Sequence, residues 1–221
     1  MREIRVTGKG NLTLIPDRTI VTVSLKGLEK EYKEAIEQSK KASQEIKNLF
    51  IDLGFEKGNI KTKMFEIESS YERDYDENER WRTIFKGYEF IHIMSVEFDK
   101  DSKLLGKIMH ELSKCASAPE LSLQYTVKDA EKQKEELLNK AIQDSKKKAK
   151  ILTEASGVSL GEILRIDYSW GETKIVSSVM DNFLDCMKLS DDEYDEDFFD
   201  MDVEPEDINL SDTVTVVWEI K

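Results

Sequence analysis

Two long stretches of helical periodicity end in nearly the same sequence, and this repetition limits the possible folds more than any other feature. Residues 31–53 are followed by Gly54-Phe55-Glu56-Lys57-Gly58-Asn59-Ile60, and residues 129–156 by Gly157-Val158-Ser159-Leu160-Gly161-Glu162-Ile163. In both, the first glycine suits the left-handed position after a helix, and the apolar residue after it suits packing on the last turn. Each helix also follows a strand-like run, and the Ile after it begins another strand-like run. The pattern therefore indicates two β-helix-β units, which are related by an old duplication or are alike only because both use the same turn.

Alternating or β-branched runs fill most of the remaining chain, and this pattern is typical of strands. We expect strands at residues 19–25, 60–71, 83–98, 121–127, 163–170 and 213–220, and a further helix at 102–116. The charged stretch 72–82 is interpreted as a hairpin tip. Such one-sided helices and alternating strands predict an α+β fold, in which long amphipathic helices pack on antiparallel-rich sheets.

The sequence Gly8-Lys9-Gly10-Asn11 invites comparison with a dinucleotide-binding loop. That fingerprint needs a third glycine and a helix directly after it, so that the helix N-terminus faces the pyrophosphate. Here an apolar, strand-like stretch follows instead, and it leads to Pro16. We interpret the four residues as a turn between two short strands, residues 4–8 and 12–14, and expect no cofactor.

Acidity is concentrated in one segment of the chain. Residues 181–207 hold thirteen Asp or Glu and one Lys, so they carry −12 of the net charge of −13, and the other 194 residues together carry −1. A nearly neutral body argues against nucleic-acid binding, which needs clustered basic residues. We expect a single domain over residues 1–221 with an acidic insertion or loop at about 171–210.

Three interpretations of the acidic segment stay open. It could hold a divalent cation, because such cations prefer several carboxylate oxygens, although the glycine and glutamate of an EF-hand loop are missing. The candidate metal ligands are Asp191, Glu193, Asp195, Asp197 and Asp200. It could instead bind a basic protein through residues 181–207, with Phe198 and Phe199 as anchors. The third interpretation is a solvated loop that keeps the protein soluble.

Residues for catalysis are scarce. There are two histidines. His92 falls on the apolar face of its strand and predicts a core histidine, whereas His110 lies among lysines and predicts a surface one. Cys115 falls on an apolar helix face, no CxxC pair exists, and Cys115 and Cys186 are expected to stay reduced. Because no nucleophile motif of the GxSxG type is present, we expect no enzyme and no catalytic residues.

Four sequence segments, in order along nearly the whole chain, resemble the SIMPL-domain family. This domain of unknown function is shared by bacterial periplasmic and immunogenic proteins and an animal kinase-associated signalling protein. The similar segments are Val6-Thr7-Gly8-Lys9-Gly10 with Pro16-Asp17, Gly87-Tyr88 with Asp101 and residues 104–106, residues 157–161, and Val203-Glu204-Pro205 with residues 213–216. The sequence departs from the family in its acidic segment and in Glu206, where the family has a glycine. The resemblance implies no catalytic residues.

These observations favour two functions of different classes. The first is a non-catalytic interaction or assembly module, with self-association expected because long strands such as residues 83–98 leave edges to cover. The second is a small-ligand or divalent-cation binding protein that uses the acidic segment, with a stress-related role. The chain has no apolar run of membrane-spanning length, and because residues 1–8 show no apolar h-region or cleavage site we expect no signal peptide. We therefore expect a cytoplasmic location, although family members are often periplasmic.

Overall fold

The computed structural model describes residues 2–75, 81–168, 175–179 and 204–221. The chain divides into two compact units, and each is described by itself. Unit 1 comprises Met1–Asp17, Thr126–Ser177 and Pro205–Lys221, and unit 2 comprises Arg18–Tyr125 and Ser178–Glu204. Both contain antiparallel strand ladders packed against helices. The predicted α+β fold class is therefore confirmed.

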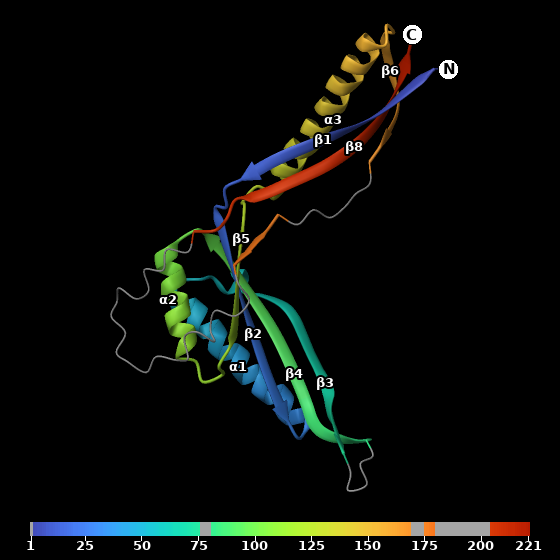
Figure 1. Ribbon diagram of the computed structural model, residues 1–221. Helices are drawn as coiled ribbons and strands as arrows, with labels where there is room; N and C mark the ends of the chain where they lie inside the picture. The colour runs from blue at the N-terminus through green and yellow to red at the C-terminus, as the bar shows by residue number, and fades with distance from the viewer. Residues whose placement is uncertain (1, 76–80, 169–174, 180–203) are drawn as a thin grey trace. The chain divides into compact units, whose positions relative to one another are not determined.

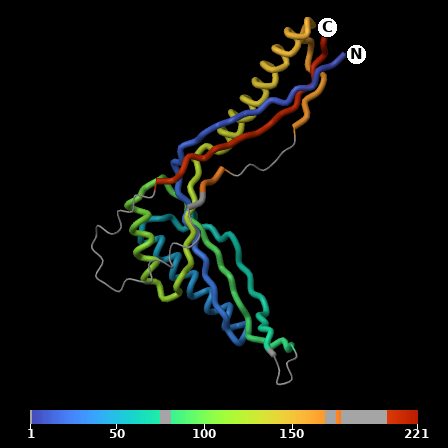
Figure 2. The backbone as a smooth tube through the Cα atoms, viewed as in Figure 1, coloured from blue at the N-terminus to red at the C-terminus, as the bar shows by residue number. Residues whose placement is uncertain are grey.

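Unit 1 is a three-stranded sheet with one long helix on its face (Figure 1). The strand order is β1 (Glu3–Leu14), β8 (Ile208–Ile220), β6 (Leu160–Asp167), and both ladders are antiparallel. The helix α3 (Ala130–Ala155) packs on β1 and β8. Since Glu3 pairs with Glu219, the two ends of the chain lie side by side, as Figure 2 shows.

The predicted turn at residues 8–11 is wrong, because β1 runs through it without a break. Gly8 and Gly10 are buried and face α3. A Cβ atom on Gly8 would lie 2.0 Å from the carbonyl oxygen of Ala141, and one on Gly10 would lie 2.2 Å from that of Leu137. Here glycine is needed because a helix backbone lies directly on the strand, and not because the chain reverses.

Polar side chains of α3 also bond the backbone of β1. The Ser145 hydroxyl donates to the carbonyl of Val6 at 3.1 Å, and the backbone N–H of Lys9 donates to the Asp144 carboxylate at 2.8 Å. Asp144 also pairs with Lys148 at 2.7 Å, and these two contacts hold its pKa below the ordinary value. Backbone groups of an edge strand are thus partly satisfied by the helix.

Unit 2 contains a larger sheet and two helices. The order is β3 (Lys61–Tyr75), β4 (Trp81–Asp99), β2 (Arg18–Glu29), β5 (Glu120–Thr126) and β7 (Ser177–Val179). The helices are α1 (Tyr32–Asp52) and α2 (Ser102–Ser113), with a short 3₁₀ turn at Lys57–Asn59. They form one apolar core with the sheet, in which the largest fully buried side chains include Phe50, Phe90, Ile46, Met94 and Ile108.

The repeated helix ending is confirmed in both units. Gly54 and Gly157 have φ angles of +96° and +69°. The N–H of Phe55 donates to the carbonyl of Phe50 at 2.9 Å, and that of Val158 donates to Thr153 at 3.0 Å. These are the six-to-one hydrogen bonds of a Schellman motif. The likeness stops there, because α1 connects strands of one sheet and α3 connects β5 and β6, which belong to different sheets.

The β3–β4 hairpin is longer than predicted. Residues 72–75 and 81–82, which we expected in the charged tip, are paired strand residues, with Tyr75 opposite Trp81. The ladder shifts register between Ser70 and Tyr71. Gly87 has φ +142°, and a Cβ there would lie 2.2 Å from the carbonyl oxygen of Glu29, at the end of β2. Similarly, β8 begins at Ile208, ahead of the predicted start at residue 213.

No helix within the described ranges is both long enough and apolar enough to cross a membrane.

Candidate functional site

His92 is a core residue, as the sequence predicts. It is 9% exposed, and its Nδ1 lies 3.3 Å from the hydroxyl of Ser39 on α1. Its Nε2 is buried without a hydrogen-bond partner among the described residues. Burial, and secondarily the charge of Lys47, lowers the pKa of the imidazole. A neutral, enclosed ring of this kind is poorly placed to exchange protons with a substrate.

Cys115 is a half-buried thiol at the end of α2. Burial and the nearby carboxylates of Glu45 and Glu111 raise its pKa to about 11. Nucleophilic attack requires the thiolate, which is scarce at neutral pH when the pKa is that high. The second cysteine, Cys186, lies outside the described residues.

The acidic segment also lies outside the described residues for the most part. This applies to all candidate metal ligands, Asp191, Glu193, Asp195, Asp197 and Asp200, and to the candidate anchors Phe198 and Phe199. Within the described ranges there is no group of three or more His, Cys, Asp or Glu residues placed to hold a metal ion. The cation and basic-partner hypotheses therefore stay predictions from the sequence.

The structure brings four aromatic rings into one row on unit 2. The ring centroids of Tyr71 and Phe85 are 5.5 Å apart, those of Phe85 and Tyr88 are 5.3 Å apart, and those of Tyr88 and Tyr32 are 5.4 Å apart. All three contacts are edge-to-face, which is a favourable geometry for aromatic pairs. Tyr71 is 60% exposed and Phe85 is 46% exposed. An apolar row with this much contact to water is a candidate interaction surface.

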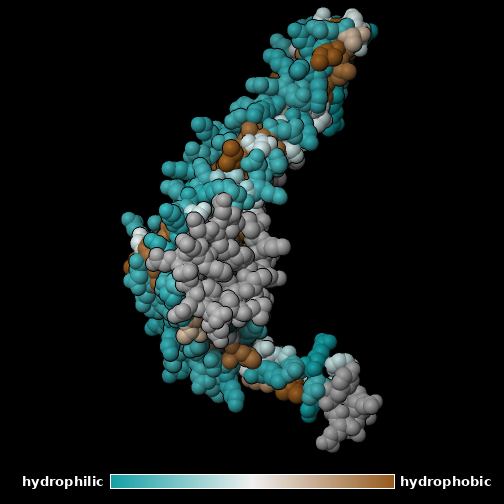
Figure 3. Space-filling view, turned by 60° about the vertical axis from the view of Figure 1, so that its left-hand side comes forward, coloured by the Kyte–Doolittle hydropathy of each residue, from teal (hydrophilic) through white to brown (hydrophobic). Residues whose placement is uncertain are grey.

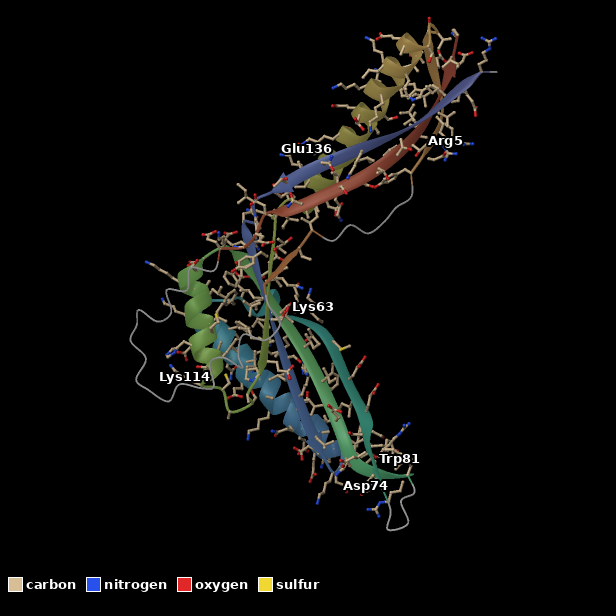
Figure 4. The ribbon with its side chains drawn as sticks, in the orientation of Figure 1. Arg5, Lys63, Asp74, Trp81, Lys114 and Glu136 are labelled. Carbon is tan, nitrogen blue, oxygen red and sulfur yellow. The ribbon has the colours of Figure 1, made fainter. Side chains whose placement is uncertain are left out.

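Most of this row lies on what we call the hairpin arm, residues 69–75 of β3 and 81–88 of β4. At its end stands Trp81, which is 65% exposed (Figure 4). Hydrophobic residues are visible beside the hairpin tip in Figure 3. The arm also contains ion pairs, Arg82 with Asp74 at 2.9 Å and Lys86 with Glu72. Its charges nearly cancel, with three basic and two acidic residues.

The outer edge of β3 is open. In the sheet order, β3 is terminal and pairs only with β4 among the described residues. A free strand edge presents unpaired backbone N–H and C=O groups that another strand can bond. The arm therefore combines an apolar surface with a strand edge whose backbone N–H and C=O groups are regularly spaced.

A second surface feature of unit 2 is the groove between α1 and α2, with a volume of about 720 Å³. Its apolar floor includes Leu49, Leu53 and Cys115, all of them half-buried. His110 lines it too, with a side chain 36% exposed, so the predicted surface histidine belongs to a groove wall. We call this feature the α1–α2 groove.

Sequence reasoning missed both surfaces. Tyr71, Phe85 and Trp81 could have been noticed, because they stand close to a stretch that is otherwise charged. Alternation alone does not show that these three side chains stay exposed in the folded chain. The groove had a weaker signal, the spacing of Lys107, His110 and Lys114 along one helix face, which is equally typical of a solvated surface.

Comparison with known proteins identifies one matching family. SIMPL, described as "Protein of unknown function (DUF541)", matches residues 4–218. Two similar proteins are the 26 kDa periplasmic immunogenic proteins of Brucella abortus (strain S19) and of Brucella melitensis biotype 1. Each is 25% identical over 163 residues, which is 74% of this chain and 65% of the relative. The aligned region thus spans somewhat less than two thirds of these relatives.

Proposed function

The chain belongs to the SIMPL family, and on that premise we propose that it is a non-catalytic assembly module that binds a second copy of itself through the hairpin arm. The observation that carries this proposal is the row of four touching aromatic rings, of which Tyr32, Tyr71 and Phe85 are exposed to solvent and Tyr88 is half-buried. Burying such rings in an interface gains about 25 cal/mol per Å² of apolar surface, before the entropy cost of association.

A second copy suits the arm better than a strongly charged partner. Net charge −13 makes two copies repel each other in general, but residues 69–88, the arm with its connecting residues, hold four basic and five acidic residues and so contribute only −1 of that charge. The open edge of β3 can pair with its counterpart in an antiparallel arrangement. Such pairing places the same residues on both sides of a two-fold axis.

The chemistry of the remaining candidates supports a non-catalytic role. His92 is neutral and enclosed, and the Cys115 thiol is protonated at neutral pH because its pKa is raised to about 11. Burial lowers the pKa of His92 from its ordinary value and raises that of Cys115, and both shifts are unfavourable for a general base or a thiolate nucleophile at neutral pH.

Light scattering after size-exclusion chromatography tests the proposal. We expect the wild-type chain to elute as a dimer or larger species, and the double variant Tyr71→Ser/Phe85→Ser to elute as a monomer with an unchanged circular dichroism spectrum. The matched control is Ile15→Ser, which removes another highly exposed apolar side chain, one that belongs to unit 1 and not to the arm; it should leave the mass unchanged. A monomeric wild-type chain, or a double variant of unchanged mass, would refute assembly through the arm.

Binding of a basic protein through residues 181–207, with Phe198 and Phe199 as anchors, is a separate prediction. Replacing both phenylalanines with Ser should abolish capture of that partner. The alternative role in divalent-cation binding predicts saturable heat in calorimetry with Ca²⁺ or Mg²⁺ that vanishes when residues 191–202 are deleted.

The cytoplasmic location also stays a prediction. The Brucella relatives are named as periplasmic proteins, and cell fractionation of the native protein distinguishes the two compartments.

A further inference from the structure

The walls of the α1–α2 groove carry opposite charges. On α1, Glu45 and Asp52 are seven residues apart and so lie on one helix face. On α2, Lys107 and Lys114 have the same spacing, with His110 between them. One wall is therefore acidic and the other mainly basic, although Glu111, which pairs with Lys114 at 2.8 Å, also lies on the basic side.

Some of these charges already have partners and some do not. The Glu45 carboxylate accepts hydrogen bonds from the backbone N–H groups of Ala116 at 3.0 Å and Ser117 at 3.3 Å. The side chains of Asp52 and Lys107, in contrast, form no hydrogen bond or ion pair within the described part of the chain. An acidic and a basic group on opposite walls are thus available to a partner that brings both signs of charge.

The floor between the walls is apolar and uncharged. Leu49 and Leu53 lie on it beside Cys115, whose thiol stays protonated because its pKa is about 11. No lining residue named here is fully buried, and Asp52, Lys107 and Lys114 are exposed. A small ligand would stay largely in water in so shallow a groove, whereas small-molecule sites typically enclose about 70–90% of the ligand surface.

We propose that the α1–α2 groove binds an amphipathic helix of a partner protein. The apolar stripe of that helix lies on Leu49, Leu53 and Cys115, its basic flank faces the α1 wall, and its acidic flank faces the α2 wall. This is the helix-in-groove mode of recognition, in which residues at i, i+3, i+4 and i+7 supply the contacts. The inference concerns another surface than the hairpin arm and does not depend on self-association.

Three synthetic peptides of about 18 residues, long enough for measurable helicity, test the charge pattern. They share one Leu/Ala stripe. One peptide carries Lys on one flank and Glu on the other, the second carries Lys on both flanks, and the third carries Glu on both. At an ionic strength of about 0.15 M, which screens the net charge of the chain, we expect the mixed peptide to bind about ten-fold more tightly than either uniform peptide in fluorescence anisotropy.

A charge reversal at Asp52 should change which peptide is preferred. In Asp52→Lys the α1 wall keeps one acidic residue, Glu45, whose carboxylate already bonds the backbone of Ala116 and Ser117. The wall's unpaired charge becomes basic, so the variant should bind the peptide with two Glu flanks best. Glu37→Lys is the matched control, because Glu37 is exposed on the same helix and does not line the groove; it should keep the wild-type preference. The proposal is overturned if the three peptides bind the wild-type chain alike, or if both variants respond in the same way.

The two histidines report where the peptide binds. His110 lines the groove and His92 lies in the core, and the chain has no other histidine. On addition of the mixed peptide, the imidazole Hε1 resonance of His110 should shift in a proton NMR spectrum while that of His92 stays in place. A saturating peptide that leaves the His110 resonance unchanged binds elsewhere, and this result contradicts the proposal.

Discussion

Units 1 and 2 both pack helices on an antiparallel sheet, but they do so with side chains of very different size. In unit 1, Gly8 and Gly10 meet Leu137, Ala141 and Ser145, and backbone lies almost directly on backbone. In unit 2, a layer of large apolar side chains separates α1 from the sheet. Adding atoms at the helix–sheet contact should therefore destabilise unit 1, and removing atoms there should destabilise unit 2.

Removing a large side chain from unit 2 should have the greatest effect. Phe50 is fully buried, and its ring lies 5.6 Å from that of Phe55. We expect Phe50→Ala to lower the free energy of unfolding by about 3–5 kcal/mol. Amide hydrogen exchange in β4 measures this loss within unit 2. Ile51→Ala, at an exposed position on the same helix, is the control and should cost much less.

Adding a single methyl group to unit 1 should be the next most damaging change. Gly8→Ala places a Cβ within 2.0 Å of the Ala141 carbonyl oxygen, so α3 must move. We expect a loss of about 1–3 kcal/mol, measured by urea unfolding monitored by the fluorescence of the buried Trp218, with Trp81 and Trp170 replaced by Phe. Gly58→Ala, where a Cβ meets nothing within 4 Å, is the control. Equal effects of the two changes would mean that the helix and strand do not lie so close.

The two helix caps should respond alike, although the units differ in packing. Gly54 and Gly157 both have left-handed φ angles, and neither would bring a Cβ near another atom. Gly54→Ala and Gly157→Ala should therefore each cost about 1 kcal/mol, from backbone strain alone. Denaturation of the two single variants checks this. A much larger loss for one of them would show that its cap has a packing role that the other lacks.

Mild acidification should lower the stability of unit 2 before that of unit 1, and this is the smallest of the four effects predicted here. The folded state lowers the pKa of His92 from its ordinary value of 6.5. The unfolded chain therefore binds a proton more readily as the pH falls through 6.5, and stability that is present above this pH is progressively lost below it. Unit 1 has no histidine, and the lowered pKa of Asp144 affects it only at more acidic pH.

Hydrogen exchange at pH 7.5 and 5.5, with rates corrected for the intrinsic effect of pH, tests this difference. Amides of β4 should lose protection at the lower pH while those of β1 keep theirs. His92→Gln should abolish most of the pH dependence in β4. The same loss in the variant and in the wild-type chain would assign the effect to another group.

The sequence predicted the long helices and their ends well, because the backbone geometry there depends on neighbouring residues. The predicted helices at residues 31–53 and 129–156 agree with α1 and α3 to within one residue at each end. Their glycine caps were predictable because a positive φ and a following apolar residue are a local requirement. The same holds for His92, whose burial follows from strand alternation.

Orientation of the helix faces was less predictable. Tyr32 and Ile36 are large apolar residues at helical spacing, yet they are 51% and 40% exposed, and Ala35 is buried instead. In α3, the buried residues include Leu137 and Thr153, whereas Leu152 is 49% exposed. A small residue between helix and sheet lets the two approach closely. A prediction based on hydrophobicity alone therefore assigns some residues to the wrong side of the helix.

The sequence by itself determined the fold class, the family and the Schellman caps, because these depend on periodicity, on short motifs and on local backbone conformation. Only the tertiary structure decided that Gly8 and Gly10 lie within a strand beneath α3, that four aromatic rings form a row with three of them exposed, and that the α1–α2 groove has walls of opposite charge. Each of these depends on residues that are distant in the chain, and a contact between such residues is set by packing rather than by sequence neighbours.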